Sequence, residues 1–349
     1  MSWHSATGSA RREAVVRLPF LVFVGVLSAC NGASQTPPPA AKAERAPDRP
    51  KPSPRTPPVR QKPAAVASAR AAPPAPAPTP PAAPSATPAP PGMLPVPAGT
   101  FTMGSDAEGE EDERPAHRVT LKEFFLDEHE VTNGQYLECV TAKNCKPWKA
   151  DAAKAMKYGS EKEFRGSKKP VVGVSWDDAK GYCEWRGKRL PTEAEWERAA
   201  RGDDARKYPW GNAFPDPKQH GCFQGCQGGA TADVGSFPAD AGPFGHHDLA
   251  GNVWEWIADA YDPYAYKRAS ADRGVPGTCE EIIAAQDELR AKKLEGYTGS
   301  NPIPTECERV LRGGAFNYHA KGLRSSNRVH HPGTWRLLVA GFRCAKDAS

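Results

Sequence analysis

The segment LPTEAEWERAARG, residues 190–202, carries the clearest helix signal in the chain. Pro191 stands at a first-turn position, Thr192 or the glutamate after it supports the start, and two arginines come shortly before Gly202. Proline suits a first turn because its missing N–H has no partner inside the helix there, and basic residues near the end complement the helix dipole. The segment therefore predicts a short helix that stops at Gly202.

Weaker signals lie on either side of this segment. Residues 131–140 (VTNGQYLECV) and 175–187 (SWDDAKGYCEWRG) have capping residues near their start, so both are predicted to be helical. Residues 93–105 mix short apolar pieces with Pro and Gly, which predicts a strand and then a turn. Residues 203–250 show almost no periodicity. We expect long irregular loops there, held by disulfides, a metal or tryptophan packing.

Residues 1–29 have the composition of a secretory signal. Arginines precede an apolar run that ends at Ala29, and this run is shorter than the roughly 20 residues that a spanning helix needs. Cys30 follows the tripeptide Leu-Ser-Ala, which resembles a bacterial lipobox, whose cysteine carries lipid. The sequence predicts export and a lipid anchor on Cys30, in the bacterial cell envelope, on the periplasmic or external side of a membrane. An ordinary cleaved signal is the alternative.

Residues 30–92 form a second region, rich in proline and alanine. Within it, residues 37–91 hold 20 of the 37 prolines and no aromatic residue. Such a composition cannot bury enough apolar surface to offset chain entropy, so we expect a disordered tether. The same stretch has eight Lys or Arg against two acids, so the chain's net charge of +5 comes from the tether and leader. The remaining residues 93–349 are slightly acidic, which argues against nucleic-acid binding.

Residues 93–349 are long enough for one domain with a sizeable core, and they hold eight of the nine cysteines. An even number in an exported chain favours disulfides, although spacing alone does not decide the pairing. Closeness in sequence favours two short disulfides, and a third could close an insertion that contains a helix over residues 280–294. These pairs are Cys139–Cys145, Cys222–Cys226 and Cys279–Cys307.

A zinc site is the alternative for one of these pairs. The sequence GCFQGC, residues 221–226, has His220, His246 and His247 as possible further ligands. However, three residues rather than two separate its cysteines, and no second CxxC follows. We therefore favour the disulfide.

Six segments, in order, carry a resemblance to a known family: PAGTFTMGS, HEVTNGQY, VSWDDAKGYCEWRGKRLPTEAEWERAARG, YPWGN, DLAGNVWEW and RGGAF…GFRCA. They resemble the signature blocks of the sulfatase-modifying-factor family, whose type member is the formylglycine-generating enzyme, across residues 94–347. The resemblance implies a single α+β domain of low regular content, related to C-type lectins. It also implies a disulfide between Cys183 and Cys344.

The family's oxidase chemistry does not carry over to this chain. In formylglycine-generating enzymes a serine and two cysteines follow the Gly-Gly pair, and the two cysteines bind copper(I). The matching positions here are Ala315, Tyr318 and Leu323. A soft cation needs soft thiolate ligands, which a phenol and an isobutyl group cannot replace. We therefore expect neither copper nor the formylglycine-generating activity.

Iron is the next metal to consider. Some relatives in this superfamily are iron-dependent oxygenases, but their iron histidines come largely from an extra N-terminal helical domain, and here that region is proline-rich. Three imidazoles, His319, His330 and His331, could suit iron, copper or zinc. We favour ordinary loop histidines over an iron site. His319 is kept as a catalytic candidate because it follows the lost first-cysteine position.

Calcium suits another block, DLAGNVWE, residues 248–255. Asp248 and Glu255 offer hard oxygen ligands, and Gly251 lets the backbone turn a carbonyl inward. In the family this block binds calcium through side chains matching Asp248 and Glu255 and through carbonyls matching Gly251 and Val253. The resemblance therefore implies a calcium site. The alternative is a tight turn whose acids cap local amides.

Three further groups of residues have a functional and a structural interpretation. The tryptophans could form a carbohydrate or peptide platform, but we expect core packing. Four arginines could clamp an anion, but we expect surface salt bridges and carbonyl contacts. For Arg343 alone, the resemblance implies a structural role. The acid run EGEEDERP, residues 108–115, is expected to be a solvated loop. The residues concerned are Trp176, Trp185, Trp196, Trp210, Trp254 and Trp256, with Arg324, Arg328, Arg336 and Arg343.

Three classes of function remain. We favour a membrane-anchored lipoprotein whose domain is a non-catalytic binding or accessory module that presents residues 315–340 to an envelope protein or glycan. The second class is a metal-dependent oxidoreductase that uses iron or copper, including a formylglycine-generating oxidase acting on sulfatases. The third is a structural envelope protein whose tether and anchor are its main purpose.

Overall fold

A computed structural model describes residues 88–150, 161–267, 278–291 and 306–348. The predicted signal, the predicted lipidation site Cys30 and nearly all of the expected tether lie outside these residues. No helix within the described ranges combines the length and the apolar character needed to cross a membrane.

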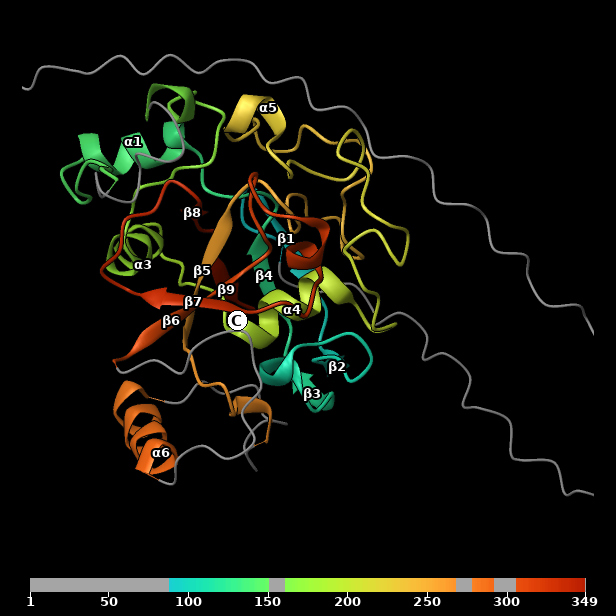
Figure 1. The fold of residues 1–349 in the computed structure, drawn as a ribbon. Helices are drawn as coiled ribbons and strands as arrows, with labels where there is room; N and C mark the ends of the chain where they lie inside the picture. Colours follow the sequence, from blue (N-terminus) through green and yellow to red (C-terminus); the bar gives the residue numbers. More distant parts are fainter. Residues whose placement is uncertain (1–87, 151–160, 268–277, 292–305, 349) are drawn as a thin grey trace, which may run out of the picture. The chain divides into compact units, whose positions relative to one another are not determined.

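Nine short strands form three sheets within the described residues, and Figure 1 shows them beside helices of modest length. The first sheet has the order β1 (Met93–Val96), β4 (Phe124–Asp127), β9 (Ala345–Asp347). The second pairs β2 (Gly99–Met103) with β3 (His117–Leu121). The third has the order β7 (Val329–Pro332), β6 (Glu308–Arg312), β5 (Trp254–Ala260), β8 (Ala340–Gly341). Only the β5–β8 pair is parallel.

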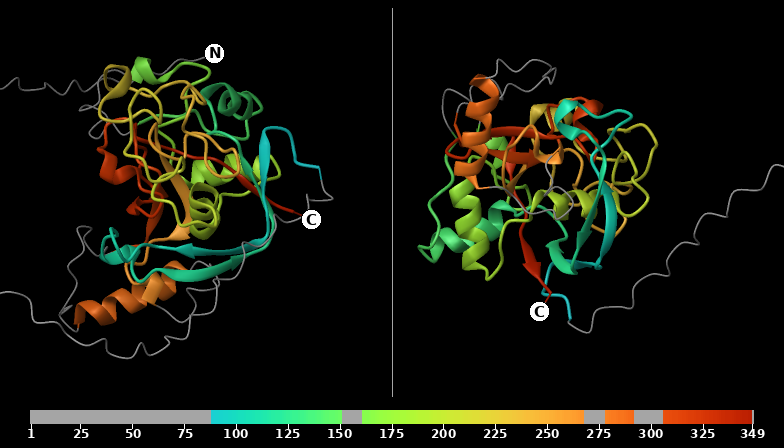
Figure 2. Two further views of the ribbon diagram at one scale, coloured as in Figure 1. Left: turned by 90° about the vertical axis from the view of Figure 1, so that its right-hand side faces the viewer. Right: turned by 90° about the horizontal axis from the view of Figure 1, so that it is seen from below.

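The α-helices of the described residues are short. They are α1 (Asn133–Thr141), α3 (Trp176–Trp185), α4 (Glu193–Arg201), α5 (Cys226–Gly229) and α6 (Cys279–Ala291). Single 3₁₀ turns add η1 (Glu111–Glu113), η3 (Glu161–Phe164), η4 (Ala265–Lys267) and η6 (Ala320–Leu323). In Figures 1 and 2, α4 lies among the strands, whereas α6 lies at the periphery. The domain is therefore α+β, with much of its chain in loops.

The three predicted helices all form, and each begins with a reciprocal capping box. The capping side chains belong to Thr132, Ser175 and Thr192. Each of these side chains accepts a hydrogen bond from the backbone N–H of the third helical residue. The side chain of that third residue in turn accepts a hydrogen bond from the backbone N–H of the capping residue. One detail of the prediction is wrong: Pro191 precedes the cap and does not lie in the first turn of α4. Gly202 follows the helix at a φ of 64°, where glycine has no steric cost.

Predictions for the less regular segments were partly right. Residues 93–105 form two strands, β1 and β2, which belong to different sheets, instead of one strand and a turn. Residues 203–250 contain only the four-residue α5, in which two residues have left-handed backbone angles. The predicted helix at 280–294 is α6, and its last predicted residues lie outside the described ranges.

The described residues contain four disulfides: Cys139–Cys145, Cys183–Cys344, Cys222–Cys226 and Cys279–Cys307. These are the four pairs expected from local closure and from the family resemblance. Cys183 and Cys344 are fully buried and tie α3 to the end of the chain across 161 residues. A bridge that closes so long a loop stabilises the fold by roughly 5 kcal/mol in the chain-entropy model.

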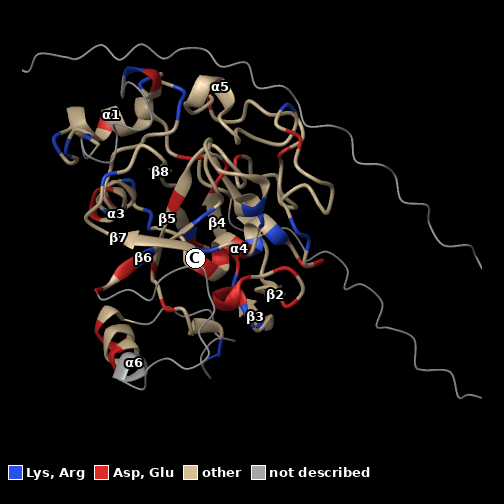
Figure 3. Ribbon diagram, viewed as in Figure 1, with Lys and Arg blue, Asp and Glu red and all other residues tan. Residues whose placement is uncertain are grey.

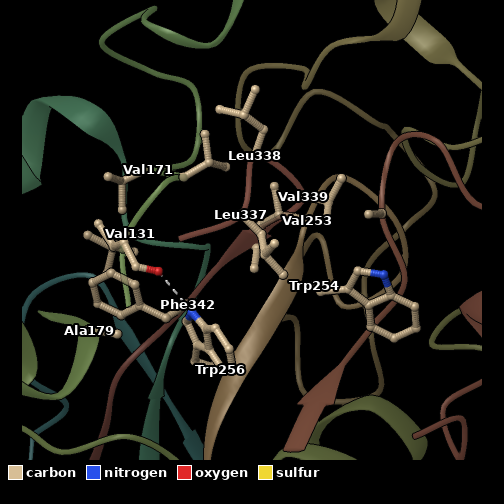
Figure 4. Close-up of a cluster of buried hydrophobic side chains, with 14 of the residues drawn as sticks. Val131, Val171, Ala179, Val253, Trp254, Trp256, Leu337, Leu338, Val339 and Phe342 are labelled. Atoms are coloured by element: carbon tan, nitrogen blue, oxygen red, sulfur yellow. Dashed lines mark hydrogen bonds between the residues drawn. The ribbon is translucent and has the colours of Figure 1, made fainter. Parts of the chain in front are cut away.

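The largest apolar cluster is centred on β5. Trp254 and Trp256 are buried in it, and Figure 4 shows Trp256 beside Val131, Ala179 and Phe342. The indole N–H of Trp256 donates to a backbone carbonyl at 3.1 Å, so its polar atom is satisfied inside the core. Trp196 is also fully buried, in a second cluster. Core packing is thus confirmed for these three tryptophans, while Trp176, Trp185 and Trp210 are only partly buried.

Helix α4 is buried along its whole length, including its charged residues. Glu193 accepts hydrogen bonds from Arg312 at 2.8 Å and from Arg328 at 2.7 and 3.0 Å. Glu197 accepts from Arg312 at 2.5 Å and from Arg201 at 3.0 Å. Figure 3 shows acidic and basic residues side by side around α4. Burying a charge is costly unless it is paired, and these pairs meet that condition.

Two expectations about charged residues are therefore wrong. The acid run at 108–115 is not wholly a solvated loop, because Glu113 is fully buried and accepts two hydrogen bonds from Arg324, at 2.5 and 2.6 Å. Arg324 and Arg328 are buried ion-pair donors and do not form surface salt bridges. Arg343 is buried and paired with Glu255, in agreement with the structural role that the resemblance implied. Only Arg336, paired with Asp178, is partly exposed as expected.

Asp259, in β5, gives a prediction about pH. Its carboxylate accepts the Glu193 N–H at 2.9 Å. Burial first, and then the charge of Glu193, raise the pKa of Asp259 from 3.8 to about 8. The folded state therefore keeps a proton that the unfolded chain loses, so this group's stabilisation is complete below pH 3.8 and is lost as pH rises towards 8. Between these two pH values the free energy of unfolding falls by about 1.4 kcal/mol per pH unit at most.

We expect Asp259→Asn to flatten this dependence, because the amide oxygen still accepts the Glu193 N–H and does not ionise. Urea unfolding measured across the same pH range would show the flattening. The exposed Asp233→Asn is the matched control and should keep the wild-type slope. Equal slopes in all three proteins would contradict the prediction.

Candidate functional site

The turn after β6 leads into the segment where the family places its chemistry. Gly313 and Gly314 have left-handed φ values of 100° and 85°. A Cβ on Gly314 would lie 2.7 Å from the Leu323 side chain, so both the backbone and the space require glycine. Ala315 follows and is fully buried. The turn thus packs against Leu323, while Ala315 lies in the neighbouring apolar cluster with Trp254.

This region contains no thiol. Leu323 is buried in a cluster with Tyr208, Phe223 and Ala250. Tyr318 packs edge-on against Trp254, with 5.0 Å between ring centres. All eight cysteines of the described residues are in disulfides. At the three positions matching the family's serine and cysteines, the side chains are therefore a methyl, a phenol and an isobutyl group.

The GCFQGC loop covers the same segment. The backbone N–H of Gln224 donates to the Tyr318 carbonyl at 2.9 Å, and that of Gly225 donates to Phe316 at 2.6 Å. Since both cysteines of this loop are in a disulfide, the zinc alternative is wrong for them. The three nearby histidines are also dispersed. His220 stacks on Trp210, His246 is fully buried, and His247 hydrogen-bonds Asp240.

The three C-terminal histidines lie in different surroundings. His319 is exposed at the start of η6. His330 is buried, hydrogen-bonds Glu308 and stacks on Tyr261, whereas His331 is its neighbour in β7 and therefore faces the other side of the sheet. In the part of the chain that is described, no three His, Cys, Asp or Glu side chains surround a point suited to a metal ion.

The predicted calcium block forms a tight, buried turn. Asp248 is 1% exposed, and its Oδ2 accepts the Gly235 N–H at 2.7 Å. Its Oδ1 is buried and has no hydrogen-bond partner among the described residues. Gly251, at a φ of 98°, provides the turn that the calcium prediction required. Glu255, in contrast, accepts from Arg343 at 2.7 and 2.8 Å and from Trp196 at 2.9 Å.

A third carboxylate, which the sequence prediction missed, joins this cluster. Glu130 is buried and accepts hydrogen bonds from Asn252 at 2.7 Å and from the Val253 N–H at 3.2 Å. Burial, and then the charges of Asp248 and Glu255, raise the pKa of Glu130 well above its usual range. Burial also raises the pKa of Glu255 despite Arg343. Excess negative charge and an open carboxylate oxygen fit a bound cation at Asp248, while Glu255 is already engaged.

A half-buried surface lies on the β6–β7 strands. The Arg309 guanidinium lies 3.7 Å from the centre of the Trp176 ring. Arg309 is directly opposite His331 in the antiparallel pair, so both side chains lie on one side of the sheet. His331 in turn stacks on Trp335, with 4.9 Å between ring centres. We call these four residues the aromatic face; each is partly exposed.

Comparisons with known proteins agree with the fold. A model of the sulfatase-modifying factor enzyme 1-like domain matches residues 79–348. The formylglycine-generating enzyme of Mus musculus is 32% identical over 306 residues, covering 72% of this chain and 73% of that protein. The inactive C-alpha-formylglycine-generating enzyme 2 of Mus musculus is 38% identical over 209 residues, covering 47% of this chain and 68% of that protein.

Another relative is much longer than this chain. The serine/threonine-protein kinase pkn1 of Chlamydia pneumoniae is 38% identical over 260 residues, which cover 71% of this chain and only 37% of that protein. Among solved structures, PvdO from Pseudomonas aeruginosa has a TM-score of 0.56 at 27% identity, over 73% of this chain and 94% of PvdO. With its fold, its signature segments and the family match in agreement, the chain belongs to the sulfatase-modifying factor enzyme 1-like family.

Proposed function

We propose that this chain is an exported, lipid-anchored envelope protein whose family domain is a non-catalytic binding or accessory module. One observation carries the proposal. Ala315, Tyr318 and Leu323 replace the serine and the two cysteines, and their side chains are packed against neighbouring residues. Copper(I) chemistry needs thiolates at these positions. The similarity to a relative named as an inactive formylglycine-generating enzyme is consistent with loss of this activity in the family.

The aromatic face is the proposed binding surface. Its tryptophans, histidine and arginine offer flat rings and a guanidinium, which are the groups enriched in the centres of protein interfaces. The rings and the guanidinium contact one another, so a partner would meet side chains that are already ordered. Trp335 lies within residues 315–340, the segment that the sequence indicated. The expected partner is an envelope protein or glycan.

Calcium is proposed as a structural ion at Asp248. The open Oδ1 atom is a hard ligand, and the turn at Gly251 could add carbonyl oxygens from Gly251 and Val253. A divalent cation there would offset the surplus charge of Glu130, Asp248 and Glu255. Glu255 would act mainly through its pair with Arg343, which holds β5 to the C-terminal segment.

The absence of oxidase activity is tested first. We expect the purified full-length protein to show no copper(I)-dependent oxygen consumption with a cysteine-containing sulfatase peptide. A Tyr318→Cys, Leu323→Cys double variant restores the two thiols and should bind copper(I) in a competition assay with a chromogenic chelator. The Tyr318→Ser, Leu323→Ser double variant, which makes nearly the same change in size at both positions without adding a thiol, is its control. Turnover by the unmodified protein would overturn the proposal and favour the oxidoreductase alternative.

If the aromatic face binds a partner, a change within this face should reduce binding, and a change elsewhere on the surface should not. Capture of partners from envelope extract should fall in Trp335→Ala and remain in Phe214→Ala. Phe214 is 74% exposed and lies outside the aromatic face, so this control also removes an aromatic ring. In cells, Cys30→Ser should leave the membrane fraction because it has no site for lipid. Unchanged capture by Trp335→Ala would rule out the aromatic face as the binding surface.

Calcium binding predicts a gain in stability. Added Ca²⁺ should raise the unfolding temperature, by an amount equivalent to about 2.7 kcal/mol when its concentration is 100 times the dissociation constant. Asp248→Ala should remove this dependence because it removes the open carboxylate. Glu138→Gln, at an exposed acid, should retain it. A protein whose unfolding is identical in Ca²⁺ and in chelator would contradict the prediction.

A further inference from the structure

Two histidines meet where the segment after β4 passes the loop before β5. The rings of His129 and His247 lie 5.2 Å apart, centre to centre, and are tilted by 32°. Their side chains are 31% and 26% exposed, so both reach solvent. The backbone N–H of His247 donates to the Glu128 carbonyl at 2.9 Å, which holds the two segments together. The pair is therefore a fixed feature of the surface.

Buried carboxylates lie behind both rings. His247 Nδ1 is hydrogen-bonded to Asp240 Oδ1 at 2.5 Å, and Asp240 is fully buried. His129 Nδ1 lies 3.7 Å from Asp248 Oδ2 and has no hydrogen-bond partner within the described ranges. The two aspartates are themselves joined, since Asp240 Oδ2 accepts the Asp248 N–H at 3.0 Å. Both Nδ1 atoms thus face one carboxylate pair, so the Nε2 atom of each ring is the nitrogen left for another ligand.

His247 has the arrangement that metal-binding histidines use, and a small shift would give His129 the same contact with Asp248. A ligating imidazole usually gives its other ring nitrogen to a carboxylate, which fixes the ring orientation and makes the free nitrogen a better ligand. At the outer edge, Glu128 Oε1 lies 3.7 Å from His129 Nε2. Two ligands bound about 2 Å from one ion stand roughly 3–4 Å apart, so this spacing suits a shared ion. The Glu128 side chain is 40% exposed and has room to rotate.

We propose that His129 and His247, completed by Glu128 and water, bind a divalent late transition-metal ion, with Zn²⁺ as the probe. Imidazole nitrogen selects zinc, nickel or copper over calcium, which prefers oxygen. Three side chains do not yet surround one point, so binding closes the site by turning the exposed Glu128 side chain. The proposed calcium ligand atom, Asp248 Oδ1, is not part of this site. The two proposals can therefore fail independently.

Zinc titration of the full-length protein by calorimetry, in excess Ca²⁺, tests the site. We expect one Zn²⁺ per chain, and at least tenfold weaker binding in His129→Asn and in His247→Asn. His117→Asn is the matched control, because it changes a partly exposed histidine in β3 that belongs to neither proposed site, and its zinc affinity should equal that of the unmodified protein. Asp240→Asn should weaken binding by about 10–100-fold, the usual effect of losing a carboxylate behind a ligating histidine.

A second measurement needs no variant and so does not depend on how well the variants fold. Zn²⁺ should protect His129 and His247, but not His319, from carbethoxylation, as read by mass spectrometry of peptides from the unmodified protein. The proposal is overturned if zinc fails to bind, if both histidine variants bind as tightly as the unmodified protein, or if neither histidine is protected. Unchanged far-UV circular dichroism in chelator would show that the variants retain the fold.

Discussion

The buried pairing of Glu193 with Arg312 and Arg328 is the interaction on which the rest of the structure depends. These three side chains are almost completely removed from water, and they join α4 to β6 and to the segment before β7. A buried charge that loses its partner costs several kcal/mol, so each arginine requires the acid to be in place. Helix α4 is fixed by this requirement as much as by its apolar contacts.

A second buried pair, Arg343–Glu255, does the same between β5 and the C-terminal segment, next to the first pair, because Glu255 is opposite Arg312 in the β5–β6 register. Neither pair includes Ala315, Tyr318 or Leu323. The fold of the family can therefore persist after the residues of its oxidation chemistry are replaced. This separation explains how intact signature segments coexist with an apolar cluster at the former reactive positions, and it is why function must be argued from the site and not from the fold.

Both proposed ion sites border one carboxylate cluster. Asp248 offers an open oxygen to calcium on one side and faces His129 on the other, while Asp240 holds His247 and the Asp248 backbone together. Occupation of one site would change the charge near the other, so the two bound ions are expected to influence each other. The aromatic face, by contrast, combines Arg309 of β6 and His331 of β7 with Trp176 of α3 and Trp335 after β7. It contacts none of these acids through any of the interactions described above.

The sequence alone determined the helix starts, because a capping residue such as Thr192 acts within four residues of itself. It also indicated the short disulfides, because their cysteines are close in sequence, and the missing thiols, because these depend on residue type at matched positions. Only the tertiary structure decided which charged residues are buried and which residues they pair with. Glu113 lies in an acid run that resembles a solvated loop, yet it pairs with Arg324, 211 residues away. His129 and His247 likewise meet only in the folded chain. Local composition cannot reveal such partners, because burial and charge pairing are set by segments that are distant in sequence.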